Sequence, residues 1–353
     1  MPTTARVVVL PQEPGPLRLE ELQLPDPGPH QVLVKQFAGG VCHSQLHQMH
    51  RQRTNPVVLG HESTGVVLKA GSEVTNVREG DHVLVTWVPR DREHTTRRPD
   101  QAVLPLANGS LARSQNVFTW ADHTIADEQY VVGMPLGTPT DVTAIIGCAV
   151  MTGAGAVYYT AGVKQGQSVA VFGVGGVGLS AIAAAKVVGA DPIIAVDLNE
   201  EKLAFAKRFG ATHGVNGSRG DAVEQVRTLS DGGVDFAFDA IGVKQTMEQI
   251  MSAAKPGLIG GPSGGTAVLV GVPTTTAELN MGDMLINEKT YKGSIGGSCK
   301  PQRDFAMFLQ WFQEGKLDLN ALVTRRYKLD QINEATDALQ SGQIAGRAIL
   351  ELA

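Results

Sequence analysis

The chain has 353 residues, of which 42% are hydrophobic and 18% are charged, and its formal net charge is −5. This length suits two globular domains, and the composition excludes a disordered or a fibrous protein. The slightly acidic balance argues against nucleic acid or an anionic membrane as a partner, because both are bound through a basic surface.

The N-terminus and the cysteines indicate a cytoplasmic protein without a disulfide framework. The first ten residues contain one basic residue and a run of only four apolar residues, too short for a secretory signal. The most apolar stretch, residues 169–185, is interrupted by glycines and is shorter than the roughly 20 residues of a membrane span. Cys42, Cys148 and Cys299 lie far apart in the chain, and Cys299 lacks a ligand-spaced neighbour, so we treat it as incidental.

Residues 1–151 predict a β-rich domain. Apolar segments at 6–10, 31–37, 63–70 and 82–87 are separated by clusters of Pro and Gly, the pattern of strands joined by turns. The end of the chain predicts a strand at 290–295, an amphipathic helix at 304–314 and a strand at 347–352. Because the first domain lacks obvious closure, we expect residues 289–353 to return and complete it.

Residues 152–288 predict a different architecture. Strand-like segments at 168–172, 193–197, 234–239 and 267–272 alternate with helix-like segments at 177–188, 200–209, 222–229 and 245–254. Strands that alternate with helices indicate a parallel sheet covered on both faces. We therefore expect a doubly wound nucleotide-binding domain here.

A glycine loop follows the first of these strands. Its five candidate contacts to a dinucleotide are Gly173, Gly175, Gly176, Val177 and Gly178, which fit G-x-G-x-x-G between a strand and a helix. The first glycine permits a tight turn, the second lets the backbone approach a pyrophosphate, and the third lets helix and strand pack closely.

Asp197 ends the next strand, at about the spacing of the acid that binds the ribose hydroxyls. A carboxylate there favours NAD over NADP, because it repels a 2′-phosphate. The alternative role for Asp197 is to cap the helix that begins near residue 200.

Candidate metal ligands lie in three short segments. Cys42 precedes His43, Ser44 and His47, while His61 and Cys148 come from two other segments. Two thiols and an imidazole match a catalytic zinc site, in which three protein ligands leave a fourth position for substrate. A single Cys or His is more often a residue of the core, and it is the joint occurrence of the three that indicates a metal site. An alcohol hydroxyl must be deprotonated before hydride can leave its carbon, and zinc lowers the pKa of a bound oxygen toward neutrality.

The same segments carry a family resemblance. Gly-x-Cys-His-Ser at 40–44, Gly-His-Glu at 60–62, Gly-Asp-His-Val at 80–83 and Gly-Cys-x-Val-x-Thr-Gly at 147–153 resemble the zinc-dependent alcohol dehydrogenases of the medium-chain superfamily. With the glycine loop, the resemblance runs from about residue 6 to 350. It implies an α/β protein with a β-rich GroES-like catalytic domain, 1–151 with 289–353, and a doubly wound Rossmann domain, 152–288. It also implies one catalytic zinc per chain, NAD, and hydride transfer between an alcohol and an aldehyde or ketone.

The resemblance assigns roles to individual residues. Cys42, His61 and Cys148 would ligate zinc, with Glu62 behind the metal, Ser44 at the substrate hydroxyl and His47 at the end of a proton relay. Further residues would contact the cofactor, namely His43, Thr152, Lys202, Val270, Val272 and Arg347. Trp87 and Trp120 fall where relatives place side chains of the substrate pocket, although packing explains them equally well.

Two departures from the family pattern are visible. Residues 89–116 contain no cysteine, which excludes the four-cysteine structural zinc site of many relatives. This segment should be held by packing and ion pairs, for which Arg90, Asp91, Arg92 and Glu93 are available. Gln45 stands where many relatives have an Asp that accepts a hydrogen bond from the zinc-ligating histidine. Its amide oxygen could accept the same bond, so we expect altered tuning of the zinc rather than its loss.

Three other functions are weighed against this interpretation. A zinc-free quinone or enoyl reductase has no need for the three ligands together, and polyol dehydrogenases commonly have a carboxylate where Cys148 stands. A sensor or structural protein that only binds nucleotide would be expected to lose a ligand or the relay. The expected partners are a small alcohol or aldehyde, whose identity the sequence leaves open, and further copies of the chain. Relatives form dimers or tetramers, and residues 290–295 are the candidate interface.

Overall fold

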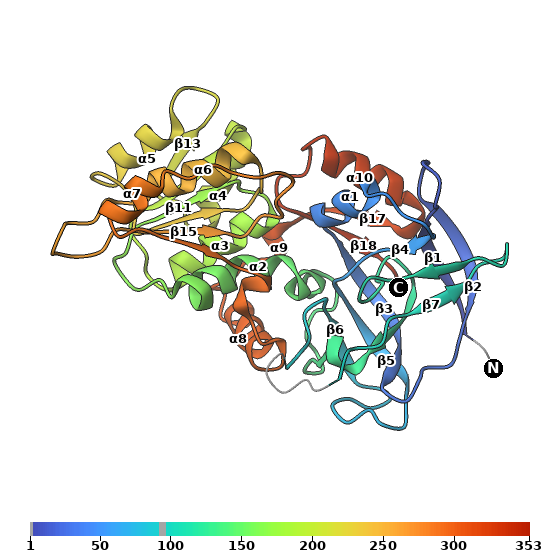
Figure 1. Cartoon of the computed structure of the whole chain (residues 1–353). Coiled ribbons are helices and arrows are strands. Elements are labelled where there is room, and N and C mark those ends of the chain that lie inside the picture. Colours follow the sequence, from blue (N-terminus) through green and yellow to red (C-terminus); the bar gives the residue numbers. More distant parts are fainter. Residues whose placement is uncertain (1–2, 92–96) are drawn as a thin grey trace. The chain divides into compact units, whose positions relative to one another are not determined.

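The computed structural model describes residues 3–91 and 97–353, and Figure 1 shows the elements in chain order. Contacts within the chain define two compact units. The first contains Met1–Cys148, Lys300–Gln310 and Leu319–Ala353, and the second contains Ala149–Cys299 and Trp311–Asp318. The predicted α/β class is confirmed, since the first unit is rich in strands and the second alternates strands with helices. The functional domain limits predicted from the sequence stay a prediction.

The described part of the first unit contains two sheets. One has the strand order β2-β1-β4-β8-β7, and the other has the order β10-β6-β5-β3-β18-β17, with β9 paired to β3. The bounds are β1 (Thr3–Leu10), β2 (Arg18–Leu24), β3 (Gln31–Val41), β4 (Val57–Val58), β5 (Ser63–Ala70), β6 (His82–Val85), β7 (Val103–Pro105), β8 (Leu111–Arg113), β9 (His123–Asp127), β10 (Val131–Gly133), β17 (Val323–Lys328) and β18 (Arg347–Glu351). Strand β18 pairs antiparallel with β3, from Ala348 opposite Val41 to Glu351 opposite Ala38. The C-terminal segment therefore returns to the first unit, as the sequence predicts.

A core cluster of the first unit supports the end of β3. It joins apolar residues of β1, β3 and β18 to helix α10 (Ile332–Gln340), and Trp120 is its largest fully buried side chain. Helix α1 (His43–His50) begins directly after β3 and packs against α10. Cys42, which lies between β3 and α1, is thus held by a strand in the middle of a sheet and by a packed helix.

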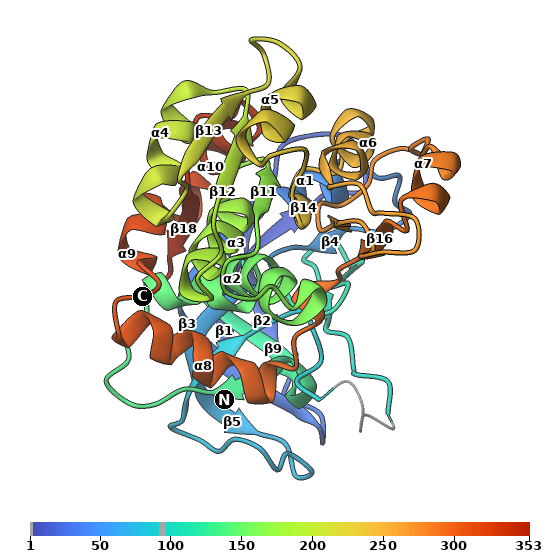
Figure 2. The ribbon, with the colours of Figure 1, turned by 90° about the vertical axis from the view of Figure 1, so that its left-hand side faces the viewer.

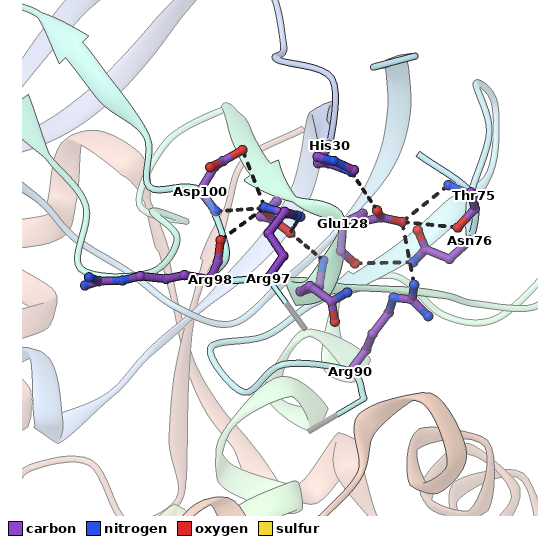
Figure 3. Close-up of polar contacts among 10 residues, drawn as sticks. His30, Thr75, Asn76, Arg90, Arg97, Arg98, Asp100 and Glu128 are labelled. Atoms are coloured by element: carbon purple, nitrogen blue, oxygen red, sulfur yellow. Dashed lines mark hydrogen bonds and ion pairs between the residues drawn. The ribbon is translucent and has the colours of Figure 1, made fainter. Parts of the chain in front are cut away.

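Ion pairs hold the segment that has no cysteines. Arg97 binds both carboxylate oxygens of the fully buried Asp127, at 2.8 and 2.9 Å. Nearby, the Glu128 carboxylate lies 3.6 Å from Arg90 and 3.3 Å from Nδ1 of His30, and Figure 3 shows both contacts. The expected use of Arg90 in an ion pair is confirmed, whereas Arg92 and Glu93 lie outside the described residues.

Packing supports the same segment. Strands β7 and β8 form an antiparallel hairpin in which Leu104 and Ala112 are fully buried. Both residues belong to a core cluster with β1 and β2, where Val7 and Leu22 lie. The hairpin is therefore anchored by ordinary apolar burial as well as by the ion pairs of its flanks.

The described part of the second unit contains a six-stranded parallel sheet in the order β13-β12-β11-β14-β15-β16. The strands are β11 (Val169–Phe172), β12 (Ile193–Asp197), β13 (His213–Asn216), β14 (Phe236–Asp239), β15 (Thr266–Leu269) and β16 (Thr290–Gly293), and the helices are α2 (Ala149–Gly155), α3 (Gly176–Val187), α4 (Glu200–Phe209), α5 (Ala222–Leu229), α6 (Lys244–Ala253) and α7 (Met281–Ile286). Helices α3 and α4 contact each other, as do α5 and α6 (Figure 2). Because crossovers between parallel strands are right-handed, the two pairs cover opposite faces.

This sheet follows the predicted alternation of strands and helices, and β13 and β16 extend it. Strand β16 lies in the segment 289–353 that we expected to complete the first domain, but it pairs with β15 in the sheet of the second unit. The sequence predicts strands in the regions of β11, β12, β14, β15 and β16, and the structure has them there. Strand β13 was not predicted, since it has four residues, contains Gly214 and is buried only at Val215 and Asn216. Helix α8 (Pro301–Gln313) is divided between the two units. None of the helices in the described residues combines the length and the apolar character needed to span a membrane.

Candidate active site

The three candidate zinc ligands belong to the first unit. Cys42 caps α1, His61 lies between β4 and β5, and Cys148 follows a short helical turn, Val142–Gly147. Gly60, which precedes His61, has φ +92°, a left-handed conformation that favours glycine. A side chain at Gly60 would also meet the backbone of Trp120, at 2.5 Å from its nitrogen. The Gly-His-Glu motif thus needs its glycine to bring His61 close to the other ligands.

The structure brings the three ligands together with Glu62. Each of the four residues offers one ligand atom, and all four atoms lie within 4.8 Å of one another. Cys42 Sγ lies 3.8 Å from Cys148 Sγ, and His61 Nε2 lies 3.2 Å from Cys148 Sγ. The two sulfur atoms are too far apart for a disulfide, whose bond length is about 2.05 Å. Two thiols and an imidazole around a common point are a donor set that suits zinc.

The two candidate thiols lie within hydrogen-bonding distance of each other, which shifts their pKa values in opposite directions. A hydrogen bond from the Cys148 thiol stabilises the Cys42 thiolate and lowers its pKa well below the usual value, although burial opposes this. The same bond, together with burial, raises the pKa of Cys148 well above its usual value. The Ser44 hydroxyl also donates to Cys42 Sγ, at 3.3 Å. The lowered pKa of Cys42 favours its thiolate, the form that binds a cation, and a cation bound by both sulfur atoms would also take the place of the Cys148 proton.

Glu62 and Arg347 form a buried pair beside the ligands. The guanidinium of Arg347, from the first residue of β18, binds the carboxylate of Glu62, and both side chains are almost completely buried. Burial raises the pKa of Glu62, while the Arg347 charge partly offsets this. A side chain at Gly40 would collide with the Glu62 carboxylate, which explains the first glycine of Gly-x-Cys-His-Ser. The structure places Arg347 on Glu62, and its predicted contact with a pyrophosphate stays a prediction.

The side-chain amide of Gln45 is oriented differently from what the sequence predicts. The Gly60 N–H donates to Gln45 Oε1 at 2.5 Å, and Gln45 Nε2 lies 2.7 Å from His61 Nδ1. A backbone N–H can only donate, so it requires the amide oxygen, and the amide nitrogen is left to face the histidine. The sequence analysis expected the amide oxygen on His61. That expectation overlooked the competing donor Gly60, which the fold brings close.

His47 lies one turn after Ser44 on α1. Its ring is 5.1 Å from that of His43, in an edge-on arrangement. Partial burial, together with the nearby Arg51 cation, lowers the pKa of His47. His47 is therefore mostly neutral near pH 7, as a proton acceptor must be.

The two tryptophans have different surroundings. The Trp87 ring lies 6.2 Å from the His61 ring, beside the metal ligands. Trp120 is fully buried in the core of the first unit, where its indole N–H donates to the Gly40 carbonyl at 3.0 Å. This position favours packing over substrate contact for Trp120, while Trp87 keeps a place next to the ligands.

The glycine loop has the backbone geometry that its sequence indicates. Gly173 has φ +89°, and a side chain at Gly178 would collide with the Gly173 carbonyl. Gly175 caps α3 and faces open space, so its backbone is accessible. The N–H groups at the start of α3 form a site for a phosphate.

Asp197 lies at the end of β12 and contacts the glycine loop. Its carboxylate accepts from Val174 N–H at 3.0 Å and from Asn199 N–H at 3.1 Å. Asn199, rather than Asp197, caps α4, because its side chain accepts from the N–H groups of Glu201 and Lys202. The capping role considered for Asp197 is thus taken by another residue. Lys202 lies in the first turn of the same helix, close to the end of β12.

Three further predicted cofactor residues, Thr152, Val270 and Val272, lie in the second unit, whereas His43 lies in the first. Val270 and Val272 follow β15, at the carboxyl edge of the sheet where α/β proteins bind nucleotides. Thr152 is buried on α2, and its hydroxyl has no hydrogen-bond partner among the described residues. The sequence analysis did not single out Leu198 and Ile241, which follow β12 and β14 at the same edge and are 70% and 41% exposed. Exposed apolar residues after parallel strands are the signal that could have identified them.

Comparisons with known proteins agree with this geometry. Residues 28–136 match the alcohol dehydrogenase GroES-like domain, and residues 176–314 match the zinc-binding dehydrogenase domain. The chain is 32% identical to the alcohol dehydrogenase class-3 of Cereibacter sphaeroides, over 97% of this chain and 98% of that protein.

Solved structures give the same result over the whole chain. An alcohol dehydrogenase zinc-binding domain protein from Burkholderia ambifaria has a TM-score of 0.90 and 30% identity, over 99% of both chains. The benzyl alcohol dehydrogenase from Acinetobacter calcoaceticus has a TM-score of 0.88 and 30% identity, over 99% of this chain and 100% of that chain.

Proposed function

We propose that this chain, which belongs to the zinc-dependent alcohol dehydrogenase family of the medium-chain dehydrogenase/reductase superfamily, reversibly oxidises an alcohol to an aldehyde or ketone with zinc and NAD. The observation that carries the proposal is the buried convergence of Cys42, His61 and Cys148. These three residues would hold zinc and leave one position for the substrate. Zinc at such a site acts as a Lewis acid and makes an alcohol hydroxyl easier to deprotonate.

The chain's own residues handle the proton. Ser44 donates to Cys42 Sγ, so its hydroxyl stands beside the proposed ligand set, where it accepts the proton of the substrate alcohol as it releases its own proton toward His47. His47 lies three residues later on α1, on the same face of the helix, and passes the proton to solvent. Its lowered pKa supports this role, because a neutral imidazole accepts a proton near pH 7.

The nicotinamide cofactor is bound by the second unit in this proposal. The glycine loop and the start of α3 bind the pyrophosphate, and Asp197 accepts hydrogen bonds from the adenosine ribose. The carboxylate of Asp197 selects NAD, because a 2′-phosphate would place two negative charges side by side. Thr152, Val270 and Val272 contact the nicotinamide, and the partnerless hydroxyl of Thr152 supports this assignment.

The proposed substrates are alcohols with a flat apolar group on the carbinol carbon. Trp87 provides an aromatic surface next to His61, and a relative with 30% identity is a benzyl alcohol dehydrogenase. A polyol dehydrogenase is less well supported, because Cys148 takes the place of the carboxylate that those enzymes commonly have. A panel of benzylic, linear, secondary and polyhydric alcohols, compared by kcat/KM, tests the substrate class.

The proposal includes assembly of chains through one edge of the six-stranded sheet in the second unit. Strand β16 forms one edge of this sheet, opposite β13, and helix α7, which precedes β16 in the chain, exposes Met281, Leu285 and Ile286. An exposed sheet edge beside exposed apolar side chains is a natural surface for a second copy of the chain. We propose a homodimer or a homotetramer built on this edge.

Metal content and activity test the function together. Protein purified without chelator is expected to contain about one zinc per chain and to form NADH in the presence of alcohol. Cys148→Ala is expected to lose both zinc and activity, whereas Cys299→Ala, which removes a buried thiol of the second unit, should keep both. Complete removal of zinc should abolish turnover and preserve the circular dichroism spectrum, because no strand of the three described sheets contains a candidate ligand. Full activity without metal, or two zinc ions per chain, would refute the proposal.

A further inference from the structure

The hydrogen bonds of Gln45, beside the proposed zinc site, conflict with metal binding. Gln45 is 2% exposed, so its amide cannot turn to water for a missing partner. Its two polar atoms face two fixed groups, the N–H of Gly60 at 2.5 Å and Nδ1 of His61 at 2.7 Å. The way in which these two contacts are satisfied determines which nitrogen of His61 carries the proton.

Without metal, the hydrogen bonds are mutually consistent. Gly60 N–H donates to Gln45 Oε1, and the Gln45 amide N–H donates to His61 Nδ1. His61 then carries its proton on Nε2, which lies 3.2 Å from Cys148 Sγ and can donate to it. This arrangement is a continuous chain of donors and acceptors from the backbone of Gly60 to the sulfur of Cys148.

A metal bound through His61 Nε2 breaks this chain. The nitrogen that binds the metal must offer its lone pair, so the imidazole proton has to move to Nδ1. Nδ1–H then faces the amide N–H of Gln45, and two donors meet. If the amide turns over, its oxygen serves His61, but its nitrogen meets the N–H of Gly60. Either orientation leaves two buried donors opposed, whereas a carboxylate would accept from both.

We infer that Gln45 is a positioning residue that stabilises the zinc-free tautomer of His61 and so weakens zinc binding at Cys42, His61 and Cys148. The inference rests on the proposed zinc function and deepens it, because it concerns the same site. Its consequence is a centre that exchanges zinc more readily than one with a carboxylate at position 45. A hydrogen-bond partner of a metal-ligating histidine typically changes metal affinity by about 10–100-fold.

Zinc affinity tests the inference directly. Q45E keeps the length of the side chain and offers two acceptors, so it should bind zinc about 10–100-fold more tightly than the wild-type chain in competition with a chromogenic chelator. Q48E adds the same charge on the same helix, at a side chain that contacts Gln115 instead of His61, and should stay within about threefold of wild type. Q45D serves as the second carboxylate variant if Q45E does not fold.

The tautomer provides a readout that does not depend on the metal. Nitrogen-15 NMR of the zinc-free, histidine-labelled chain should place the His61 proton on Nε2 in the wild type and on Nδ1 in Q45E, with His61→Asn used for assignment. Equal zinc affinity of wild type and Q45E, or an Nδ1 proton in the zinc-free wild type, overturns the inference. Failure of the wild-type chain to take up zinc contradicts the proposed function instead, and the tautomer measurement still decides the role of Gln45.

Discussion

Asp197 has two roles in the second unit, and both depend on its carboxylate. It holds the glycine loop through Val174 N–H, and in the proposed function it also accepts from the ribose of NAD. Asp197→Asn keeps the size and one oxygen but removes the charge. We expect kcat/KM with NAD to fall by about 10–100-fold, the range for loss of a hydrogen bond to a charged group, and the preference over NADP to shrink.

A matched control distinguishes the loss of a nearby negative charge from the loss of a direct contact between Asp197 and the cofactor. Glu201→Gln removes an exposed carboxylate in the first turn of α4, which follows the same strand. It should leave both kcat/KM values nearly unchanged. Equal use of NAD and NADP by the wild-type chain would show that Asp197 does not select the cofactor.

The lowered pKa of His47 sets the direction in which the rate of alcohol oxidation should change with pH. As a base, His47 acts only when neutral, so alcohol oxidation should decline as the pH falls through a pKa below the usual histidine value of about 6.5. His47→Gln should remove this dependence and slow oxidation near neutral pH by up to about 100-fold. His50→Gln, at the exposed end of the same helix, is the control. An unchanged pH profile in His47→Gln, with hydride transfer rate-limiting, would exclude the relay.

Ion pairs support the segment that leads into the hairpin of β7 and β8. It lies where many relatives bind a structural zinc, and Arg97 joins its approach to the buried Asp127 at the end of β9. In place of a metal, this segment is held by the buried Asp127 carboxylate, by its two contacts with the Arg97 guanidinium, and by a small apolar core.

Arg97→Ala tests this element. Asp127 would keep the backbone donors of Asp100 and Gln129, so we expect a loss of about 2 kcal/mol in the free energy of unfolding, not the larger cost of a fully stranded charge. Arg78→Ala removes an exposed guanidinium from its pair with Asp81 and should cost less than about 1 kcal/mol. Urea unfolding of the two variants measures both losses in the free energy of unfolding. A similar loss in both would mean that packing alone holds the hairpin.

At the scale of the whole molecule, the exposed edge of the second unit predicts how chains assemble. Leu285 on α7 is 78% exposed and lies beside other exposed apolar side chains. Leu285→Asp should therefore shift the sedimentation profile toward the monomer. Leu136→Asp, at a 79% exposed leucine of the first unit, should not. A monomeric wild-type chain, or an assembly that Leu285→Asp leaves intact, would place the interface elsewhere or exclude it.

The sequence by itself determined the class of the fold and the chemistry of the candidate site. The alternation of strands and helices after residue 152 reports a parallel sheet, because backbone periodicity is local and each period leaves its own pattern of apolar residues. The glycine loop can be predicted from the sequence for the same reason, since the turn at Gly173 and the close packing at Gly178 are short-range requirements of the backbone. The residue types of Cys42, His61 and Cys148, together with the family resemblance of the motifs around them, also predict the candidate zinc ligands.

Only the tertiary structure decided the partners of these residues. Cys42 and Cys148 are separated by 106 positions, and Arg347 reaches Glu62 across 285, distances over which no periodicity carries information. Trp120 lies in the core and Trp87 beside His61, a difference that the two indoles cannot reveal in sequence. The orientation of Gln45 depends on one backbone N–H, that of Gly60, which is a donor common to every non-proline residue and becomes decisive only through its position.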